Sequence, residues 1–542
     1  MANKTIDQLT STLAASTVTD PSVVRLGVGD STSGSAVSKK IAASELMKLA
    51  PFDVVADVTA LLAVTHARDN QLFQTRGYTT EGVGANLYRY DAASSATIDG
   101  GFVLPGIGGA LGFTGTTFSG TAGTGRYVAV DQSVADVTKF GADSSAVNNL
   151  SSIQRAINSS DVVYVPSGSF DVNAALVLRT GSSLRGCGQN SSVINQTSSD
   201  VPIISITSSS TNYYWSISDV RLSYDTQQTT TETSALGIQL ATTNVNTYLG
   251  VIENVMVSGA YRGVSLPNLT GCTAFLIRMS NVHARQCAQW GFHLEGASSG
   301  SRTNLVLNEC WVENTAGSEI STRKGFYIAS TDGFSLNNCG CDHIQDQHAL
   351  RIDNSNGRVG VFWAESCDIT ASSFKTLFEF IGTSVVVDEI YAAFNNVSLS
   401  GSADFSLVRA QSGSNVAIGV LVDKETEMTD TSSGAYYTVQ ASSSDVVTVG
   451  EFKYTAGSSP ANNGNLADFG TVKYIRIFDG NEKTSVRGSK LHVYGTSAPA
   501  SGTWAVGDIM WNTSPAAAGT IGWVCTTAGT PGTWKTFGTI AS

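Results

Sequence analysis

The chain has 542 residues, more than one compact core usually supports, so its length predicts several domains or one elongated, repetitive architecture. Glycine is abundant (54 residues) and only 14% of residues are charged, a composition that favours an all-β chain with many turns. A formal net charge of -12 argues against a protein whose main task is to hold nucleic acid, because binding phosphates requires a basic surface.

The beginning of the chain, M-A-N-K-T-I-D-Q-L-T, lacks the charged and apolar regions of a secretory signal. No run of about 18 apolar residues follows it. We therefore expect a soluble protein that is not conventionally secreted and does not insert into a membrane. Its eight cysteines are expected to be thiols rather than a disulfide framework.

Residues 1–70 are expected to form an N-terminal segment with helices, and the first 50 or so of them to become ordered only against a partner or against copies of themselves. A candidate helix lies at 42–49, and a second one within 52–70 is apolar nearly all round, which suggests contact between chains. A Gly-rich β segment is expected from 71 to 135. Its glycines at 106–112 do not form a dinucleotide-binding loop, because Leu111 takes the place of the third glycine.

Four short motifs follow one another after residue 136. They are F-G-A (140–142), I-Q-R-A-I (153–157), V-Y-V-P-S-G (163–168) and L-R-G-C-G (184–188). The second lies in a predicted amphipathic helix at 150–158, which would cover the open edge of a first β coil. Together the motifs resemble the entrance of the pectate-lyase-like β-helix shared by many bacteriophage tailspikes. The chain departs from that pattern at 144–150, where S-S-A-V-N-N-L replaces the usual acidic G-D-G and D-D-T segments.

Seven short segments between residues 219 and 399 superimpose on one another at intervals of 27 to 35 residues. Each has a small apolar residue, its anchor, followed two positions later by another, as in a strand with one buried face. A second apolar strand recurs after most anchors, and a third precedes several of them. The pattern predicts an all-β, parallel β-helix with three strands per coil over 136–450, followed by a C-terminal β module at 451–542. The resemblance implies that this β-helix is right-handed. The anchors are Val220, Val255, Val282, Cys310, Cys339, Cys367 and Val397.

The stretch N-N-C-G-C-D-H-I-Q-D-Q-H (337–348) contains residue types that bind metals. The repeat instead places Cys339 and Cys341 in the core and Asp342 on the opposite face, so the three cannot share a metal ion. The cysteines are expected to pack as small hydrophobic residues. His343 and His348 are expected to make turn contacts, and neither a metal nor another cofactor is expected.

The positions one and three residues after each anchor face outward, and they predict one surface patch with an aromatic face for sugar stacking and several carboxylates. Its candidate catalytic residues are Glu313, Asp342 and Asp368, and its candidate substrate-binding residues are His283, Arg285 and Trp311.

Glu313 and Asp342 hold equivalent positions on adjacent coils, so their Cα atoms are expected about 5 Å apart. Repulsion between the two carboxylates would raise the pKa of one of them and supply an acid together with a base or nucleophile. That spacing suits a retaining glycosidase better than an inverting one. The alternative is an exposed pair neutralised by Arg285 or water. Hydrogen bonding to asparagines of neighbouring coils is expected to account for Glu365.

Both ends of the chain extend the resemblance to phage proteins. K-T-I-D-Q-L-T (4–10) is similar to the virion-attachment ends of tail fibres and tailspikes, the segment 77–131 resembles their neck, and residues 494–535 resemble a small C-terminal β module. The four tryptophans of that module are expected to form core and trimer contacts rather than a sugar site.

The resemblance implies a homotrimer in the phage tail, made in the host cytoplasm and attached by its N-terminus to tail or adaptor proteins. It implies binding of a host surface polysaccharide, either lipopolysaccharide O-antigen or capsule, with or without cleavage by a glycoside hydrolase or lyase reaction. Two alternatives stay open. One is a structural fibre whose β-helix is a rigid spacer, and the other is a cellular polysaccharide lyase.

Overall fold

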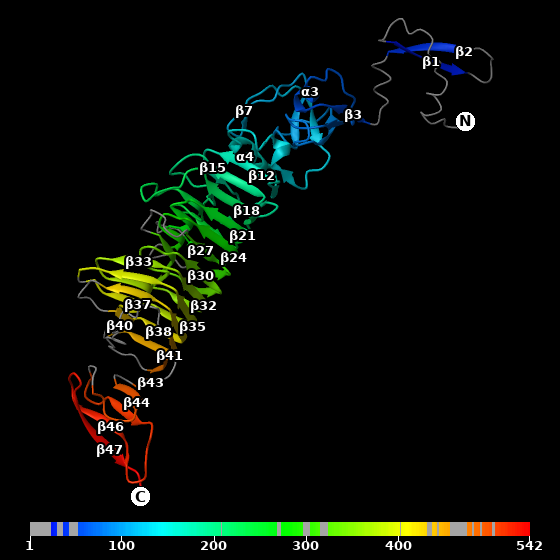
Figure 1. The fold of residues 1–542 in the computed structure, drawn as a ribbon. Helices are drawn as coiled ribbons and strands as arrows, with labels where there is room; N and C mark the ends of the chain where they lie inside the picture. The colour runs from blue at the N-terminus through cyan, green and yellow to red at the C-terminus, as the bar shows by residue number, and fades with distance from the viewer. Residues whose placement is uncertain are drawn as a thin grey trace. The chain divides into compact units, whose positions relative to one another are not determined.

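The computed structural model describes residues 23–29, 36–42, 52–207, 209–267, 273–295, 304–314, 323–401, 403–430, 436–441, 444–455, 474–479, 482–487, 490–500 and 504–542. Contacts divide the chain into two units, 1–133 with 138–141, and 134–137 with 142–542 (Figure 1). The candidate helix at 42–49 lies outside the described residues except for Ala42, the last residue of strand β2. None of the helices in the described ranges is long and apolar enough to cross a membrane.

The first unit is built on a five-stranded sheet of order β3-β4-β5-β9-β6, so the Gly-rich segment is β structure as predicted. The prediction of a helix within 52–70 is wrong for most of that range, because only α3 is helical and residues 52–55 form a strand. Asp57 starts this helix by accepting a hydrogen bond from the Ala60 amide at 2.7 Å. Val58 and Leu61 of the helix are buried within the unit itself. The elements are β1 (Val23–Gly29), β2 (Ala36–Ala42), β3 (Phe52–Val55), α3 (Val58–Leu62), β4 (Leu72–Thr75), β5 (Leu87–Asp91), β6 (Val103–Ile107), β7 (Phe113–Thr114), β8 (Thr117–Phe118) and β9 (Thr124–Ala129).

The second unit begins with a helix that covers the first strands of a parallel β-helix, as the sequence predicts. This helix, α4 (Leu150–Ser159), packs against β10 (Ala135–Asp136), β11 (Val162–Tyr164) and β13 (Leu176–Val177). Its residues Ile153 and Ile157 are fully buried. The backbone edge of the first coil is therefore covered by a helix, which leaves no edge there to pair with another chain.

Two extended parallel sheets form most of the β-helix (Figure 1). The ten-strand sheet contains the strands predicted after each anchor. Its members are β13, β16 (Ile204–Ser205), β19 (Leu236–Gln239), β22 (Arg262–Leu266), β25 (Trp290–Leu294), β28 (Lys324–Ala329), β31 (Leu350–Asp353), β34 (Lys375–Ile381), β37 (Phe405–Gln411) and β40 (Tyr436–Ala441).

The second extended sheet, here the long sheet, contains four of the seven anchors, Val220, Val255, Val282 and Cys339, and Cys310 lies between two of its strands. After β10 and β11, its β-helix members are β12 (Gly168–Val172), β14 (Ser183–Arg185), β15 (Ser192–Gln196), β18 (Ser216–Tyr224), β21 (Val251–Ser258), β24 (Arg278–Arg285), β26 (Val306–Asn308), β27 (Trp311–Glu313), β29 (Asp332–Asn337), β30 (Cys339–Asp342), β32 (Asn356–Glu365), β35 (Ser384–Ala393), β38 (Asn415–Lys424) and β41 (Val446–Thr455).

Two short sheets lie at the corners of the coils. One contains β17 (Thr211–Tyr213), β20 (Asn246–Tyr248) and β23 (Thr273–Phe275), and the other contains β33 (Asp368–Ala371), β36 (Asn396–Leu399) and β39 (Glu427–Asp430). The C-terminal strands are β42 (Tyr474–Asp479), β43 (Glu482–Arg487), β44 (Lys490–Gly495), β45 (Ile509–Asn512), β46 (Thr520–Thr527) and β47 (Thr533–Thr539). Most of these pair as antiparallel hairpins.

The segments predicted as a separate strand before Cys310 and Cys339 belong to the same long sheet as the strands that follow them, whereas V-F-W (361–363) lies in the long sheet and its anchor Cys367 does not. A kink separates the two parts in each coil, at Asn254, Asn281, Glu309 and Asn338, all with φ between 50° and 53°. This left-handed conformation is costly for most L-residues and least so for asparagine, which explains the residue type at three of these kinks. The Asn281 side-chain amide donates to Asn254 Oδ1 of the previous coil at 2.8 Å, so consecutive kinks are also bonded to each other.

The predicted repeat register is confirmed up to Cys339 and fails in the next coil. Val220, Val255 and Val282 pair in succession, and Trp311, next to Cys310, pairs with Gly340, next to Cys339. In the following coil Cys339 pairs with Phe362 rather than with Cys367, because this coil is shorter than the ones before it. Cys367 follows a second corner, where the Asp368 amide donates to the Ile344 carbonyl at 2.8 Å.

The β-helix core contains the predicted cysteines and a run of phenylalanines. Cys310, Cys339, Cys341 and Cys367 are fully buried, which confirms their role as small core residues. Burial raises the pKa of the Cys310 and Cys341 thiols, and it raises the pKa of Cys287 to about 12. These groups therefore stay protonated and unreactive in the folded chain.

Thiol labelling is expected to separate Cys187 from the buried cysteines. Of the seven described cysteines only Cys187 is exposed, while Cys339 and Cys341 react only when their coils open. A brief maleimide treatment followed by peptide mass mapping should modify Cys187 at least about ten-fold faster than the core cysteines. The Cys187→Ser variant is the control. Equal labelling of Cys187 and Cys339 would contradict the core assignment.

Candidate functional site

Two rows of side chains run next to each other along the outward face of the long sheet. The aromatic row contains residues paired in consecutive coils, His283, Trp311, Gly340, Trp363 and Tyr391. The acidic row contains Arg285, Glu313, Asp342 and Glu365, which pair in the same way. Members of the two rows are two positions apart in their strands, so both rows face the same side of the sheet.

The aromatic row presents partly exposed indole and phenol rings. A Cβ atom at Gly340 would lie 2.6 Å from Trp311 Cζ3 and 2.8 Å from Trp363 Cβ. The absence of a side chain at Gly340 therefore makes space for the Trp311 ring to lie against the sheet. The rings of Trp363 and Tyr391 follow, with centroids 4.3 Å apart. Rings of this kind provide flat apolar surfaces with a polar edge, which suits contact with the faces of sugar rings.

The acidic row places a cation and three carboxylates in four consecutive coils. Arg285 Nη2 lies 3.0 Å from Glu313 Oε1, and both side chains are 39% exposed. This contact is the neutralising interaction of the alternative interpretation. Glu313 and Asp342 are paired in register, so the predicted adjacency of the two residues is confirmed. Parallel neighbours are about 4.8 Å apart.

The Asp342 carboxyl has a raised pKa. Partial burial raises the pKa of its carboxyl, the charge of Glu313 raises it further, and His343 opposes both effects. His343 Nδ1 lies 2.8 Å from Asp342 Oδ1. The net result is a pKa above the ordinary value, as expected for a carboxyl group that retains a proton next to an ionised partner.

The structure brings five of the six predicted patch residues together on this face and separates the sixth. Asp368 begins β33, beyond the corner at Ser366, and accepts a hydrogen bond from Asn396 at 2.9 Å. The position predicted for Asp368, next to Gly340 in the aromatic row, belongs to Trp363, and Glu365 takes the next place in the acidic row by pairing with Asp342. His283 lies in the aromatic row, where burial lowers its pKa and favours the neutral ring.

The two histidines of the 337–348 stretch have different environments. His343 lies at a left-handed corner (φ 55°) against Asp342, as a turn contact. His348 is only 2% exposed and contacts Glu379 at 2.7 Å across the ten-strand sheet. No sequence pattern indicates this second polar cluster, because its members come from different coils.

The C-terminal tryptophans pack within their own module. Trp504 and Trp534 form an edge-to-face pair with ring centroids 5.2 Å apart, and Trp511 packs against Phe537 at 5.4 Å. The Trp534 indole donates to the Pro531 carbonyl at 3.0 Å. These contacts account for three of the four rings by packing inside the chain.

Comparison with solved structures finds similar phage tailspikes. A tailspike of an Acinetobacter phage is 10% identical and has a TM-score of 0.49, with 80% of this chain and 76% of that one covered. Tailspike protein 2 of an Escherichia coli bacteriophage is 12% identical with a TM-score of 0.42, covering 84% of this chain and 56% of that one. The tailspike of a second Acinetobacter phage is 12% identical with a TM-score of 0.43, covering 90% and 91%.

No family model matches the chain, and no curated protein matches it. The chain spans little more than half of the Escherichia coli phage protein. At such identities the activities of these proteins are not carried over to this chain.

Proposed function

We propose that the chain is a bacteriophage tailspike that binds a host surface polysaccharide, O-antigen or capsule, on the outward face of the long sheet and cleaves it there. The observation that carries this proposal is the parallel course of the aromatic and acidic rows. A polysaccharide lying along them would stack on aromatic rings while its glycosidic bonds pass over paired carboxylates.

In this proposal Asp342 is the general acid and Glu313 is the second carboxylate. The raised pKa of Asp342 lets it protonate the leaving glycosidic oxygen. Glu313, held by Arg285, attacks the anomeric carbon as that bond breaks. Water then hydrolyses the glycosyl-enzyme ester, with Asp342 accepting the proton of the water. Carboxylates on adjacent coils suit the short separation of a retaining glycosidase.

The motifs at both ends of the chain extend the proposal to assembly. Their resemblance to tailspike and tail-fibre segments supports a homotrimer that is bound to tail or adaptor proteins by its N-terminus and belongs to the virion. Three chains with equivalent sites would increase the avidity for a repetitive glycan. The high local concentration of binding sites and glycan repeats, rather than tight binding at any one site, would then hold the particle on its host.

A second candidate function is a non-enzymatic fibre whose β-helix acts as a spacer. The Arg285–Glu313 contact favours it, because a neutralised carboxylate needs no catalytic role. This alternative predicts an unchanged glycan after prolonged incubation with the protein.

The proposal is tested with envelope polysaccharides from a panel of bacteria, by following oligosaccharide length and new reducing ends. Wild-type protein is expected to shorten one of them. Replacing both Trp311 and Trp363 by alanine should weaken binding to that polysaccharide by about ten-fold or more, because two stacking surfaces are lost. Tyr214→Ala, which removes a 66% exposed ring outside the two rows, is the control. Equal weakening by both changes would remove the aromatic row from the binding site.

A further inference from the structure

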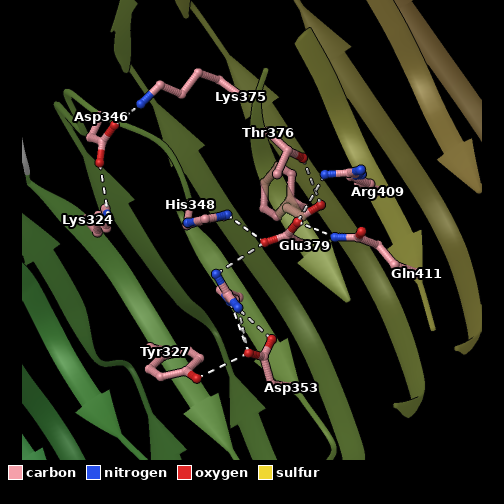
Figure 2. Close-up of polar contacts among 12 residues, drawn as sticks. Lys324, Tyr327, Asp346, His348, Asp353, Lys375, Thr376, Glu379, Arg409 and Gln411 are labelled. Atoms are coloured by element: carbon pink, nitrogen blue, oxygen red, sulfur yellow. Dashed lines mark hydrogen bonds and ion pairs between the residues drawn. The ribbon is translucent and has the colours of Figure 1, made fainter. Parts of the chain in front are cut away.

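A second polar cluster lies on the ten-strand sheet, apart from the two rows (Figure 2). Its centre is Glu379 of β34, which pairs with Arg351 of β31 on one side and Arg409 of β37 on the other. Gln440 of β40 continues this line beyond Arg409. Figure 2 shows the His348, Arg409 and Gln411 side chains directed at the Glu379 carboxylate.

Glu379 is a fixed anion rather than a proton donor. Its side chain is 6% exposed, and it accepts hydrogen bonds from His348 Nε2 at 2.7 Å and from Gln411 Nε2 at 2.6 Å. Desolvation pushes its pKa up, but the hydrogen bond from His348 and the charges of Arg351 and Arg409 hold the pKa below the ordinary value. The role of Glu379 in the cluster is therefore to position the cations around it.

Arg351 and Arg409 use their guanidinium groups differently. Arg351 donates from Nε and Nη2 to Asp353, at 3.1 and 2.7 Å, so its fork is occupied. Arg409 Nη1 is 3.6 Å from Glu379 Oε1, too far for a hydrogen bond. Its guanidinium instead lies 4.1 Å from the centre of the Phe374 ring. Among the described residues, no side chain or backbone oxygen accepts a hydrogen bond from this group.

Arg409 is therefore held in place while its donors remain open. The side chain is 30% exposed, so the guanidinium reaches solvent. Next to it, Gln440 has a buried side-chain oxygen without a hydrogen-bond partner among the described residues. A planar cation with free donors, next to a free amide, matches a ligand that has both a carboxylate and hydroxyl groups.

The net charge of the side chains in this cluster favours binding of an anionic ligand. Four cations, Lys324, Lys375, Arg351 and Arg409, face three carboxylates, Asp346, Asp353 and Glu379. Desolvation lowers the pKa of His348, which leaves its ring neutral in this balance. The cluster around Glu379 is thus locally cationic in a chain whose net charge is -12. Electrostatic attraction of an acidic ligand would be focused here.

We propose that Arg409 binds the carboxylate of a sugar acid, with Gln440 contacting an adjacent hydroxyl, so that the glycan recognised by this protein contains uronic-acid units. This inference rests on the proposed polysaccharide-binding function and specifies its substrate class. A bidentate pair between guanidinium and carboxylate would replace the solvent that now faces Arg409. Phe374 and Glu379 keep the guanidinium oriented before the ligand arrives.

Calorimetric titration of the full chain with two matched probes tests the proposal. The probes are oligogalacturonate and the same oligosaccharide with its carboxyl groups reduced to alcohols. Arg409→Gln is expected to weaken oligogalacturonate binding by at least about ten-fold and to leave the reduced probe unaffected. Arg409→Lys retains the charge without the planar fork, so its affinity for oligogalacturonate should lie between those of wild type and Arg409→Gln. The matched control is Arg358→Gln, an exposed arginine that pairs with Asp388 at 2.8 Å.

Each outcome has a defined meaning. Preference for oligogalacturonate that is lost in Arg409→Gln supports the site. Equal binding of both probes by wild-type protein would overturn the uronate assignment while leaving the polysaccharide-binding function intact. Unchanged binding of oligogalacturonate by Arg409→Gln would exclude Arg409 as the residue that binds the carboxylate. Failure of wild-type protein to bind either probe would overturn the uronate assignment, and the proposed function would then be judged separately by the polysaccharide panel.

Discussion

Asp342→Asn is expected to reduce polysaccharide cleavage by about 100- to 10,000-fold, the usual contribution of a positioned general acid. The amide occupies the same volume but cannot protonate the leaving oxygen. Binding should change little, because the aromatic row and Arg285 remain. Release of reducing ends under saturating polysaccharide measures the rate, and affinity is measured separately with the inactive variant. Full activity in Asp342→Asn or in Glu313→Gln would remove that carboxylate from the mechanism.

The raised pKa of Asp342 also fixes the sign of two pH effects. Cleavage needs the protonated acid, so the rate should fall as pH rises through this raised pKa. A carboxyl whose pKa is raised by folding stabilises the folded state below its unfolded pKa, and that contribution is lost as pH rises through the folded pKa. Asp342→Asn should therefore melt no lower than wild type at neutral pH. A large drop in melting temperature would instead point to a structural role.

Phe326→Ala is expected to destabilise the β-helix by about 3–5 kcal/mol, the usual cost of removing a fully buried aromatic ring. Phe326 stacks on Phe292 with centroids 4.6 Å apart and meets Phe362 of the long sheet edge-to-face at 5.2 Å. Its loss opens a cavity between the two sheets. Denaturant unfolding followed by tryptophan fluorescence measures the change.

Val386→Ala is the matched control, since this residue of β35 is 52% exposed and its truncation leaves no cavity. Its effect should stay within about 0.5 kcal/mol. If Phe326→Ala and Val386→Ala unfolded at the same denaturant concentration, the phenylalanine stack would not be a stabilising core.

Much of the β-helix could be predicted because its signal is repeated. Every coil before Cys339 brings a small apolar pair to the interior, and the errors of a single segment are averaged over several copies. The first unit has no such repetition. There a short apolar run at 52–55 could be helix or strand, and pairing with β4, a contact distant in sequence, determines the outcome.

The error in the candidate site has a specific physical cause. In V-F-W-A (361–364) the outward position holds Trp363, so the alternation of apolar and polar residues that marks a strand disappears. The S-C-D-I segment at 366–369 has the expected alternation but lies past the corner. Because Trp363 is an outward-facing aromatic residue, the strand register of this coil could not be recognised from the alternation pattern. For the same reason the position of Glu365 in the acidic row was not predicted. The Glu379 cluster could not be predicted, since nothing in the local pattern shows which outward residues of distant coils meet.

The single capping helix at the N-terminal end has a consequence for biosynthesis. Because α4 seals the N-terminal edge of the first coil, new coils can add only at the opposite, open edge as the chain emerges from the ribosome. Until synthesis is complete, the newest coil presents unpaired amides and carbonyls to its surroundings. Polypeptides truncated within the repeat should therefore precipitate with one another.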